Sequence, residues 1–199
     1  MGFSFLNDLE GNKPSKPMEI YGEHVILSRI TNDDLDFICR IECDRDLWQF
    51  EESVPSDEQV VRSNYLDKIN EGSETTSYDF IVRLVNDRNR TPIGLAQVWS
   101  YIDYRKSWEL GFAILPQHCG QGYGSEAAKL LLKFAFEQLH AHKVVGMCNS
   151  QNARSAALME HIGMTQEAVF KEELFWKGEW TDQFYYSILE KEFFEGKQL

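Results

Sequence analysis

Three glycines at alternate positions, Gly120, Gly122 and Gly124, form the stretch of this sequence that is best suited to bind a ligand. They follow an apolar segment that ends at Pro116, and they precede a long amphipathic run. Glycine lets a ligand approach the main chain closely, and the first turn of a helix offers unpaired N–H groups at the positive end of its dipole. A strand, a bare glycine turn and a helix start together form a cradle for an anion, so we expect a phosphate-bearing ligand here.

The spacing of the glycines discriminates between phosphate-binding motifs. No lysine follows them where the P-loop requires one, and Ser125 stands where the dinucleotide-binding fingerprint needs its third glycine. The stretch instead resembles the acyl-CoA pyrophosphate loop of the GNAT N-acetyltransferases, Gln/Arg-x-x-Gly-x-Gly/Ala, with Gly122-Tyr123-Gly124 as its second half. Cys119 stands where the family usually has Arg or Gln, a departure that is also common in the branch of the ribosomal-protein N-terminal acetyltransferases. The alternative is a glycine-rich turn before an ordinary helix.

A second segment supports the resemblance. Residues 152–164, Asn-Ala-Arg-Ser-Ala-Ala-Leu-Met-Glu-His-Ile-Gly-Met, are similar to the family's Asn-x-x-Ser-x-x-Leu-x-Glu-Lys-x-Gly-Phe segment. Residues 23–29 resemble the Thr-Glu-Arg-Leu-x-Leu-Arg opening of the same branch, so the likeness covers roughly residues 20–190. It implies an acetyl-CoA-dependent enzyme that moves an acetyl group to a primary amine, on a protein N-terminus or a small molecule, by direct attack.

The resemblance also implies how the cofactor would be held. The pyrophosphate would bind the backbone N–H groups of Gln121, Gly122, Tyr123, Gly124 and Ser125, assisted by the helix dipole. The pantetheine arm would pair as an added strand with the main chain of Phe112, Ala113 and Ile114. Asn152 and Ser155 would contact the cofactor as well, and Asn152 is equally suited to be the N-cap of its own helix.

Glu109 is the candidate general base. A protonated amine must lose a proton before it attacks, and a carboxylate can accept that proton directly or through water. On an extended strand Glu109 shares its side with the small residues Gly111 and Ala113, which leave room for a substrate. The alternative is that Glu109 is a solvated structural carboxylate, in which case Glu173 or a water chain would be the base.

The acid that protonates the leaving thiolate is a separate question. Many relatives have a tyrosine for this role, but Met159 stands at that position, so Ser155 or bulk water would take the role.

The acidic segment 42–58 is the candidate acceptor site. It holds seven carboxylates and one arginine, and the resemblance places it beside the acceptor channel. The residues that we expect to bind the acceptor are Trp48, Phe50, Glu51 and Glu52, which resemble a Trp-Phe-Glu-Glu segment of the spermidine acetyltransferases in altered spacing. Three functions stay open: a protein acetyltransferase, an acetyltransferase for polyamines or aminoglycosides, and a non-catalytic acyl-CoA-binding regulator.

Composition narrows the class of protein. The formal charge of −12 over 199 residues, with no basic cluster, argues against nucleic-acid binding. No apolar run approaches the roughly 20 residues that span a bilayer, and residues 1–16 do not resemble a signal peptide. Four cysteines without a paired framework fit a reducing cytoplasm, and the histidines lack metal-ligand spacing, so we expect no metal. Homodimerisation is left open.

The hydrophobic pattern of the sequence predicts the strands and helices that position these residues. We expect a mixed α/β fold of the GNAT acyl-CoA N-acyltransferase type, a mostly antiparallel mixed sheet flanked by about four helices. A mobile arm at residues 1–18 would precede a single domain at 19–199. Strands are expected near 23–30, 78–85, 92–101, 106–115, 144–148, 165–174 and 183–189, and helices near 31–45, 56–70, 122–140 and 152–161.

Overall fold

The computed structural model describes residues 18–70 and 76–196. The predicted arm at residues 1–18 lies outside these ranges except for Met18, and so does the predicted helix end at 71–73. Among the described residues, no helix combines the length and the apolar character needed to cross a membrane.

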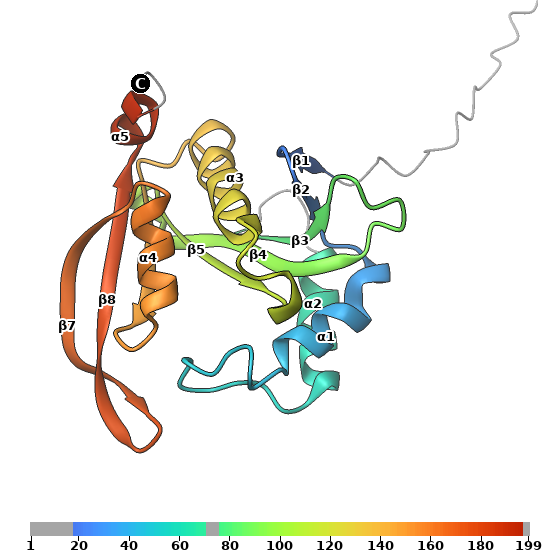
Figure 1. Ribbon diagram of the computed structural model, residues 1–199, viewed down its shortest axis with the longest axis horizontal. Helices are drawn as coiled ribbons and strands as arrows, with labels where there is room; N and C mark the ends of the chain where they lie inside the picture. The colour runs from blue at the N-terminus through green and yellow to red at the C-terminus, as the bar shows by residue number, and fades with distance from the viewer. Residues whose placement is uncertain (1–17, 71–75, 197–199) are drawn as a thin grey trace, which may run out of the picture.

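One twisted sheet of eight strands forms the centre of the described structure, in the order β1-β2-β3-β4-β5-β6-β8-β7 (Figure 1). Neighbouring strands run antiparallel except β5 and β6, which run parallel. The strands are β1 (Glu19–Tyr21), β2 (Val25–Arg29), β3 (Ser77–Leu84), β4 (Pro92–Ile102), β5 (Ser107–Ile114), β6 (Lys143–Asn149), β7 (Thr165–Trp176) and β8 (Glu179–Leu189). This confirms the predicted mixed, mostly antiparallel sheet, and β1 is a short strand that the sequence pattern did not predict.

Helices cover both faces of the sheet. The described residues form α1 (Leu35–Glu42), α2 (Glu58–Asn70), α3 (Tyr123–Glu137), α4 (Ala153–His161) and α5 (Glu190–Glu195). The short α5 is additional to the four expected helices. It directly follows β8, and its Phe193 packs on Phe136 of α3 with ring centroids 5.0 Å apart.

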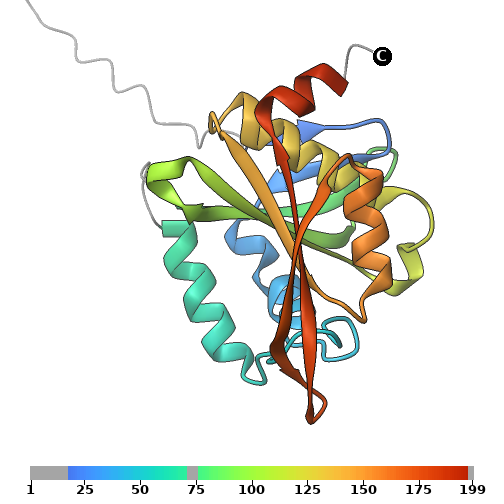
Figure 2. The ribbon, with the colours of Figure 1, turned by 90° about the vertical axis from the view of Figure 1, so that its left-hand side faces the viewer.

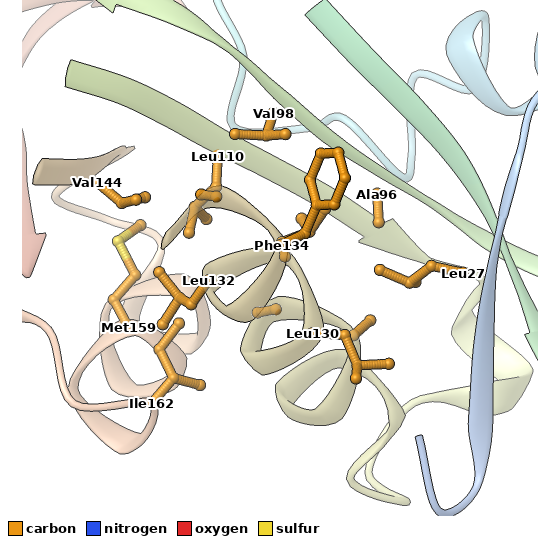
Figure 3. Close-up of a cluster of buried hydrophobic side chains, with 14 of the residues drawn as sticks. Leu27, Ala96, Val98, Leu110, Leu130, Leu132, Phe134, Val144, Met159 and Ile162 are labelled. Atoms are coloured by element: carbon orange, nitrogen blue, oxygen red, sulfur yellow. The ribbon is translucent and has the colours of Figure 1, made fainter. Parts of the chain in front are cut away.

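Two hydrophobic cores lie on opposite faces of the sheet. The larger core packs α3 and α4 against one face, where Phe134 of α3 meets strand residues such as Leu27 and Val98 (Figure 3). Met159 of α4 and Ile162, the residue after the helix, complete this core beside Val144 (Figure 3). The smaller core packs α1 and α2 against the other face, over Ile81, Leu95 and Ala113. Residues that alternate along β5 therefore face different cores.

A buried polar network fixes α1 and α2 to the sheet. The Tyr65 hydroxyl of α2 donates to Glu42 Oε1 of α1 at 2.6 Å and accepts from Gln97 Nε2 of β4 at 2.9 Å. Lys68 Nζ donates to both carboxylate oxygens of the buried Asp79 on β3 at 3.2 Å. Because buried polar groups are costly unless they are hydrogen-bonded, this network sets where the α1–α2 connection, residues 43–57, can lie.

The β7–β8 hairpin extends beyond the rest of the sheet toward the α1–α2 connection (Figures 1 and 2). Its two strands pair from Thr165↔Ser187 to Trp176↔Glu179, with register shifts between Gln166 and Ala168 and between Phe170 and Leu174. Two segments that are distant in the sequence meet at its tip, and this contact belongs to the candidate site.

Candidate functional site

The glycine turn between β5 and α3 has an open, strained backbone that suits an anion. Gly122 is the N-cap of α3 with φ 84°, and Gly120 has φ 77°, a region that L-residues with side chains rarely adopt. A Cβ added at either glycine would meet nothing within 4 Å. The first N–H groups of α3 have no partner within the helix, so the turn presents donors and a positive dipole end to open space.

Gly124 and Cys119 have different roles from the two open glycines. A Cβ added at Gly124 would lie 3.4 Å from Leu158 Cδ1 and 3.5 Å from Ile114 Cγ1, so this glycine sets how closely α3 packs on β5 and α4. The Cys119 thiol lies 3.4 Å from the Ile114 carbonyl oxygen and 3.5 Å from that of Leu115. The Cys119 thiol is therefore engaged at the end of β5.

β5 and β6 separate next to the turn. Their pairing begins at Ser107↔Lys143 and ends at Glu109↔Val145, although β5 continues to Ile114 and β6 to Asn149. On its other side β5 stays paired with β4 as far as Ile114↔Gly94. The main chain of Phe112, Ala113 and Ile114 thus lies beyond the point where the two strands part, as a pantetheine arm bound as an added strand would require.

The end of β6 and the start of α4 line the β6 side of this opening. Asn152 caps α4, because its Oδ1 accepts the Ser155 N–H at 3.1 Å. The Ser155 side chain hydrogen-bonds Cys148, whose pKa burial raises to about 11 while this bond opposes the rise. The Ser155 hydroxyl thus already has a partner in the structure.

Asn149 is a residue that sequence reasoning missed. It is 3% exposed at the end of β6, and its Oδ1 accepts the Gln151 N–H at 2.9 Å. Its Nδ2 has no hydrogen-bond partner among the described residues. Since the bond to Gln151 fixes the orientation of the amide, a buried N–H donor remains that a ligand carbonyl would satisfy. An Asn at a strand end gives no local signal of this kind.

Glu109 lies at the point where the strands part. Burial raises the pKa of its carboxyl to about 7, a side-chain hydrogen bond from Trp99 opposes this rise, and the charge of Glu51 adds to it. Trp99 is the cross-strand neighbour of Glu109 on β4. Its six-membered ring covers Gly111, because a Cβ added there would lie 3.0 Å from Cη2 and Cζ3. A carboxyl that titrates near neutral pH is suited to accept a proton from an amine.

The predicted acceptor residues occupy different positions. The Trp48 indole N–H donates to the Ile41 carbonyl oxygen at 2.8 Å, and its ring packs against the smaller core. Phe50 stacks on Trp176 of β7 with centroids 5.5 Å apart, and Glu52 Oε1 accepts the Phe175 N–H at 2.8 Å. Glu51 is the member of the four that acts on Glu109, and partial desolvation, followed by the charge of Glu52, raises its pKa.

Contacts between residues 49–52 and residues 175–176 form a clasp beside the predicted acceptor residues. Besides the Phe50–Trp176 stack and the Glu52–Phe175 bond, Trp176 Nε1 donates to the Gln49 carbonyl oxygen at 2.7 Å. The clasp joins the α1–α2 connection to the tip of the β7–β8 hairpin (Figure 2). It thereby holds Glu51 near the strand that carries Glu109.

The larger surface concavity lies away from the predicted site residues. A concavity of about 560 Å³ lies near the opposite end of β5 and contains none of the predicted site residues; it is lined by Tyr104, Arg105, Lys106, His140, His142 and Glu190. A smaller one of about 320 Å³ includes Tyr123 of the glycine turn. Over the described ranges, no three His, Cys, Asp or Glu side chains are grouped to hold a metal ion.

Comparison with known proteins agrees with this geometry. Residues 24–165 match the acetyltransferase (GNAT) domain. The N-acetyltransferase YnaD of Bacillus subtilis, an uncharacterised protein, is 36% identical over 86 residues, which are 43% of this chain and 51% of YnaD, so the match spans about half of that relative. The spermidine N(1)-acetyltransferase of Vibrio cholerae is 25% identical over 158 residues, 78% of this chain and 87% of that protein.

A solved structure shares the fold. The crystal structure of spermidine N-acetyltransferase from Vibrio cholerae in complex with CoA and spermine superposes with a TM-score of 0.78 at 22% identity, over 87% of this chain and 99% of that one. The domain match covers most of the described sheet and includes the glycine turn, Glu109 and the Asn152 segment. This chain belongs to the GNAT family of acetyltransferases.

Proposed function

We propose that this chain is an acetyl-CoA-dependent enzyme that acetylates a primary amine by direct attack, with Glu109 as general base. The observation that carries the proposal is the position of Glu109, a carboxyl with a pKa near 7 at the last residue where β5 and β6 pair. The open glycine turn and the parted strands lie on the same side of that residue, so a cofactor arm in the opening would end close to the base.

We assign cofactor binding, proton acceptance and proton donation to different residues. Acetyl-CoA, when bound, supplies an activated thioester carbonyl. The N–H groups of residues 121–125 would hold its pyrophosphate, and the free Asn149 Nδ2–H would hold a carbonyl oxygen. Glu109 would accept a proton from the ammonium group of the acceptor, which frees the lone pair for attack. Ser155 is a candidate to protonate the departing thiolate, and it would have to exchange its Cys148 partner to do so.

We propose that the acceptor amine binds as a cation, before it gives up its proton. Glu109 and Glu51 interact electrostatically, and over the described residues neither forms an ion pair with a lysine, arginine or histidine. An ammonium group would offset part of the negative charge of this pair. Two acceptors are candidates. The resemblance to the ribosomal-protein branch favours a protein N-terminus. A polyamine is the second candidate, because a relative that aligns with 78% of this chain at 25% identity is a spermidine acetyltransferase.

A thiol-release assay tests the proposal. Wild type, Glu109→Gln and Glu173→Gln are incubated with acetyl-CoA and a panel of spermidine, an aminoglycoside and a basic N-terminal peptide. Glu173 is an exposed carboxylate on β7 and is the alternative base, so its variant decides between the two carboxylates. We expect Glu109→Gln to lose most of kcat at pH 7 and to recover part of it at pH 9, where free amine is abundant. Glu173→Gln should match wild type.

Two outcomes would overturn parts of the proposal. Equal turnover of wild type and Glu109→Gln across this pH range would remove Glu109 as the base. Protection of the protein by acetyl-CoA against thermal unfolding, without thiol release on any amine, would indicate a cofactor-binding regulator.

A further inference from the structure

Three aromatic residues from three different strands meet beside Glu109. The rings of Tyr101 on β4 and Tyr185 on β8 have centroids 6.5 Å apart, and Phe170 of β7 meets Tyr185 at 5.8 Å. In the sheet order, β5 and β6 lie between β4 and β8. Three strand spacings amount to roughly 14 Å, so the two tyrosine rings can meet only by leaning over β5 and β6.

These rings lie on the face of the sheet that carries Glu109. Glu109 pairs with Val145 of β6, Val145 pairs with Ser187 of β8, and Tyr185 is two residues from Ser187 on the same face. Burial and then the neighbouring Tyr101 raise the pKa of Tyr185, and Glu167 and Glu109 contribute smaller effects in the same direction. Glu109 and Tyr185 are thus close enough to act on each other.

The surface of this aromatic cluster is open. Tyr101 is 40% and Phe170 is 41% exposed, although both are large apolar side chains. Exposed apolar residues that cluster next to a functional group mark a ligand contact more often than isolated ones do. We call Tyr101, Phe170 and Tyr185 the aromatic platform.

A cationic side chain of the protein already lies beside one ring of the aromatic platform. Lys143 Nζ lies 5.6 Å from the centroid of Tyr185, within the range of a cation–π contact. The charge of Lys143 is matched by Glu167 at 2.6 Å, which in turn accepts from Ser187 Oγ at 2.6 Å. The carboxylates of Glu109 and Glu51 stay available for the ammonium group of a ligand.

From these contacts we infer that the aromatic platform binds the apolar body of the acceptor, and that the acceptor is an amine carried on an aromatic or long aliphatic body. The inference rests on the proposed function, because the platform lies beside the proposed base. The ammonium group would approach Glu109 while the body stacks on Tyr185 and Tyr101. A polyhydroxylated amine gains little from such a surface, since its hydroxyls would give up water without finding hydrogen-bond partners.

Direct binding measurements keep this inference separate from catalysis. 2-Phenylethylamine, hexylamine and ethanolamine are titrated into the protein saturated with CoA, and their dissociation constants are measured by calorimetry. We expect 2-phenylethylamine and hexylamine to bind at least about tenfold more tightly than ethanolamine. The variants Tyr185→Ala and Tyr101→Ala should abolish most of that preference while ethanolamine binding changes by less than twofold.

Two further variants control for folding and for the hydroxyl group. Tyr185→Phe keeps the ring and should keep the preference. Tyr104→Ala removes a tyrosine that is 80% exposed on the turn before β5 and should behave as wild type. Because Tyr101 is exposed, its truncation tests the platform even if Tyr185→Ala unfolds.

The outcomes separate this inference from the proposed function. Equal binding of the three amines to wild type, or equal losses for all three in the platform variants, would overturn the platform. Binding that follows the predicted order without thiol release would support the platform and contradict the proposed acetyl transfer.

Discussion

At the scale of single residues, the environment that raises the pKa of Glu109, the proposed base, also destabilises the fold. Burial raises its pKa from an ordinary carboxyl value to about 7, which means that the folded state disfavours the ionised form. The stabilisation associated with the protonated carboxyl is complete below the unfolded pKa and is lost as pH rises through 7. Active sites commonly carry such a cost.

Glu109→Gln should therefore stabilise the protein increasingly as pH rises from 4.5 to about 7, with little further gain at higher pH. The gain over wild type should be small at pH 4.5 and should grow to at most about 3 kcal/mol at pH 8, since one pKa unit corresponds to about 1.4 kcal/mol. Urea unfolding of both proteins at several pH values measures the difference. Parallel stability curves would show that the Glu109 carboxyl is not perturbed by the fold.

Trp99 affects the pKa of the Glu109 carboxyl. Its side-chain hydrogen bond lowers the pKa of Glu109, against the effect of burial. Trp99→Phe keeps an aromatic ring over Gly111 but removes the N–H donor. The acidic limb of the pH profile of kcat/KM should move to higher pH, with a loss of about three- to tenfold at pH 6.5.

Trp108→Phe is the matched control for that variant. Trp108 lies on the opposite face of the sheet, where it contacts Tyr78 at a centroid distance of 6.0 Å. Its replacement should leave the pH profile in place. Identical shifts in the two variants would mean that Trp99 acts through packing alone.

The sequence shows Glu109 but not Trp99, for a physical reason. Strand alternation places Glu109 beside Gly111 and Ala113 without knowledge of any other strand. The neighbour across the sheet depends on the β4–β5 register, and that register shifts between Ser100 and Ile102. A shift of one residue exchanges the faces, so local pattern cannot identify the partner.

At the scale of elements, periodicity predicted most helices and strands because each buries one face against the sheet. The exceptions are two short pieces. β1 pairs with the next strand, β2, over three residues, too few to show a periodic pattern. α5 depends on the contact of Phe193 with Phe136, which is distant in the sequence. The clasp joins residues about 125 positions apart, as the Trp176–Gln49 bond illustrates, and neither segment indicates its partner.

The clasp should matter for the acceptor and not for the cofactor. Trp176→Ala removes both the stack on Phe50 and the hydrogen bond to the Gln49 carbonyl oxygen. Freeing the α1–α2 connection lets Glu51 leave the acceptor side, so KM for the amine should rise about three- to tenfold. Thermal shifts by acetyl-CoA should not change. Trp180→Ala, at a tryptophan 61% exposed on the same hairpin, is the control and should leave KM unaltered.

The glycine turn is the element whose function can be tested without an acceptor. Gly122→Asp would add a Cβ at φ 84° and a negative charge at the N-terminus of α3. Acetyl-CoA should raise the Tm of wild type but not that of the variant. Gly178→Asp places the same side chain at a similar backbone angle, φ 87°, on the remote hairpin tip and should keep the full shift. An unchanged shift in Gly122→Asp would reject the turn as the pyrophosphate site.

At the scale of the whole molecule, the net charge of −12 acts with opposite sign on the two proposed substrates. A strongly acidic protein attracts cations and repels anions over distances that salt screens, with a Debye length of about 10 Å at 0.1 M. A cationic amine should therefore bind less well as salt rises. In the proposed site, local backbone N–H groups would hold acetyl-CoA against a repulsive overall field, so screening should not weaken its binding.

Measuring KM at about 20 and 300 mM salt separates the effect of the protein's overall charge from the effect of the Glu51 carboxylate. KM for spermidine should rise several-fold in wild type, and the dissociation constant of acetyl-CoA should stay level or fall. Glu51→Gln leaves most of the net charge but removes the carboxylate whose charge raises the pKa of Glu109. Its KM should be higher at low salt and should respond less to salt than that of wild type. Glu23→Gln removes an equal charge from the turn between β1 and β2 and should respond as wild type does. If Glu51→Gln and Glu23→Gln shift KM equally, the acidic segment acts only through the total charge of the protein.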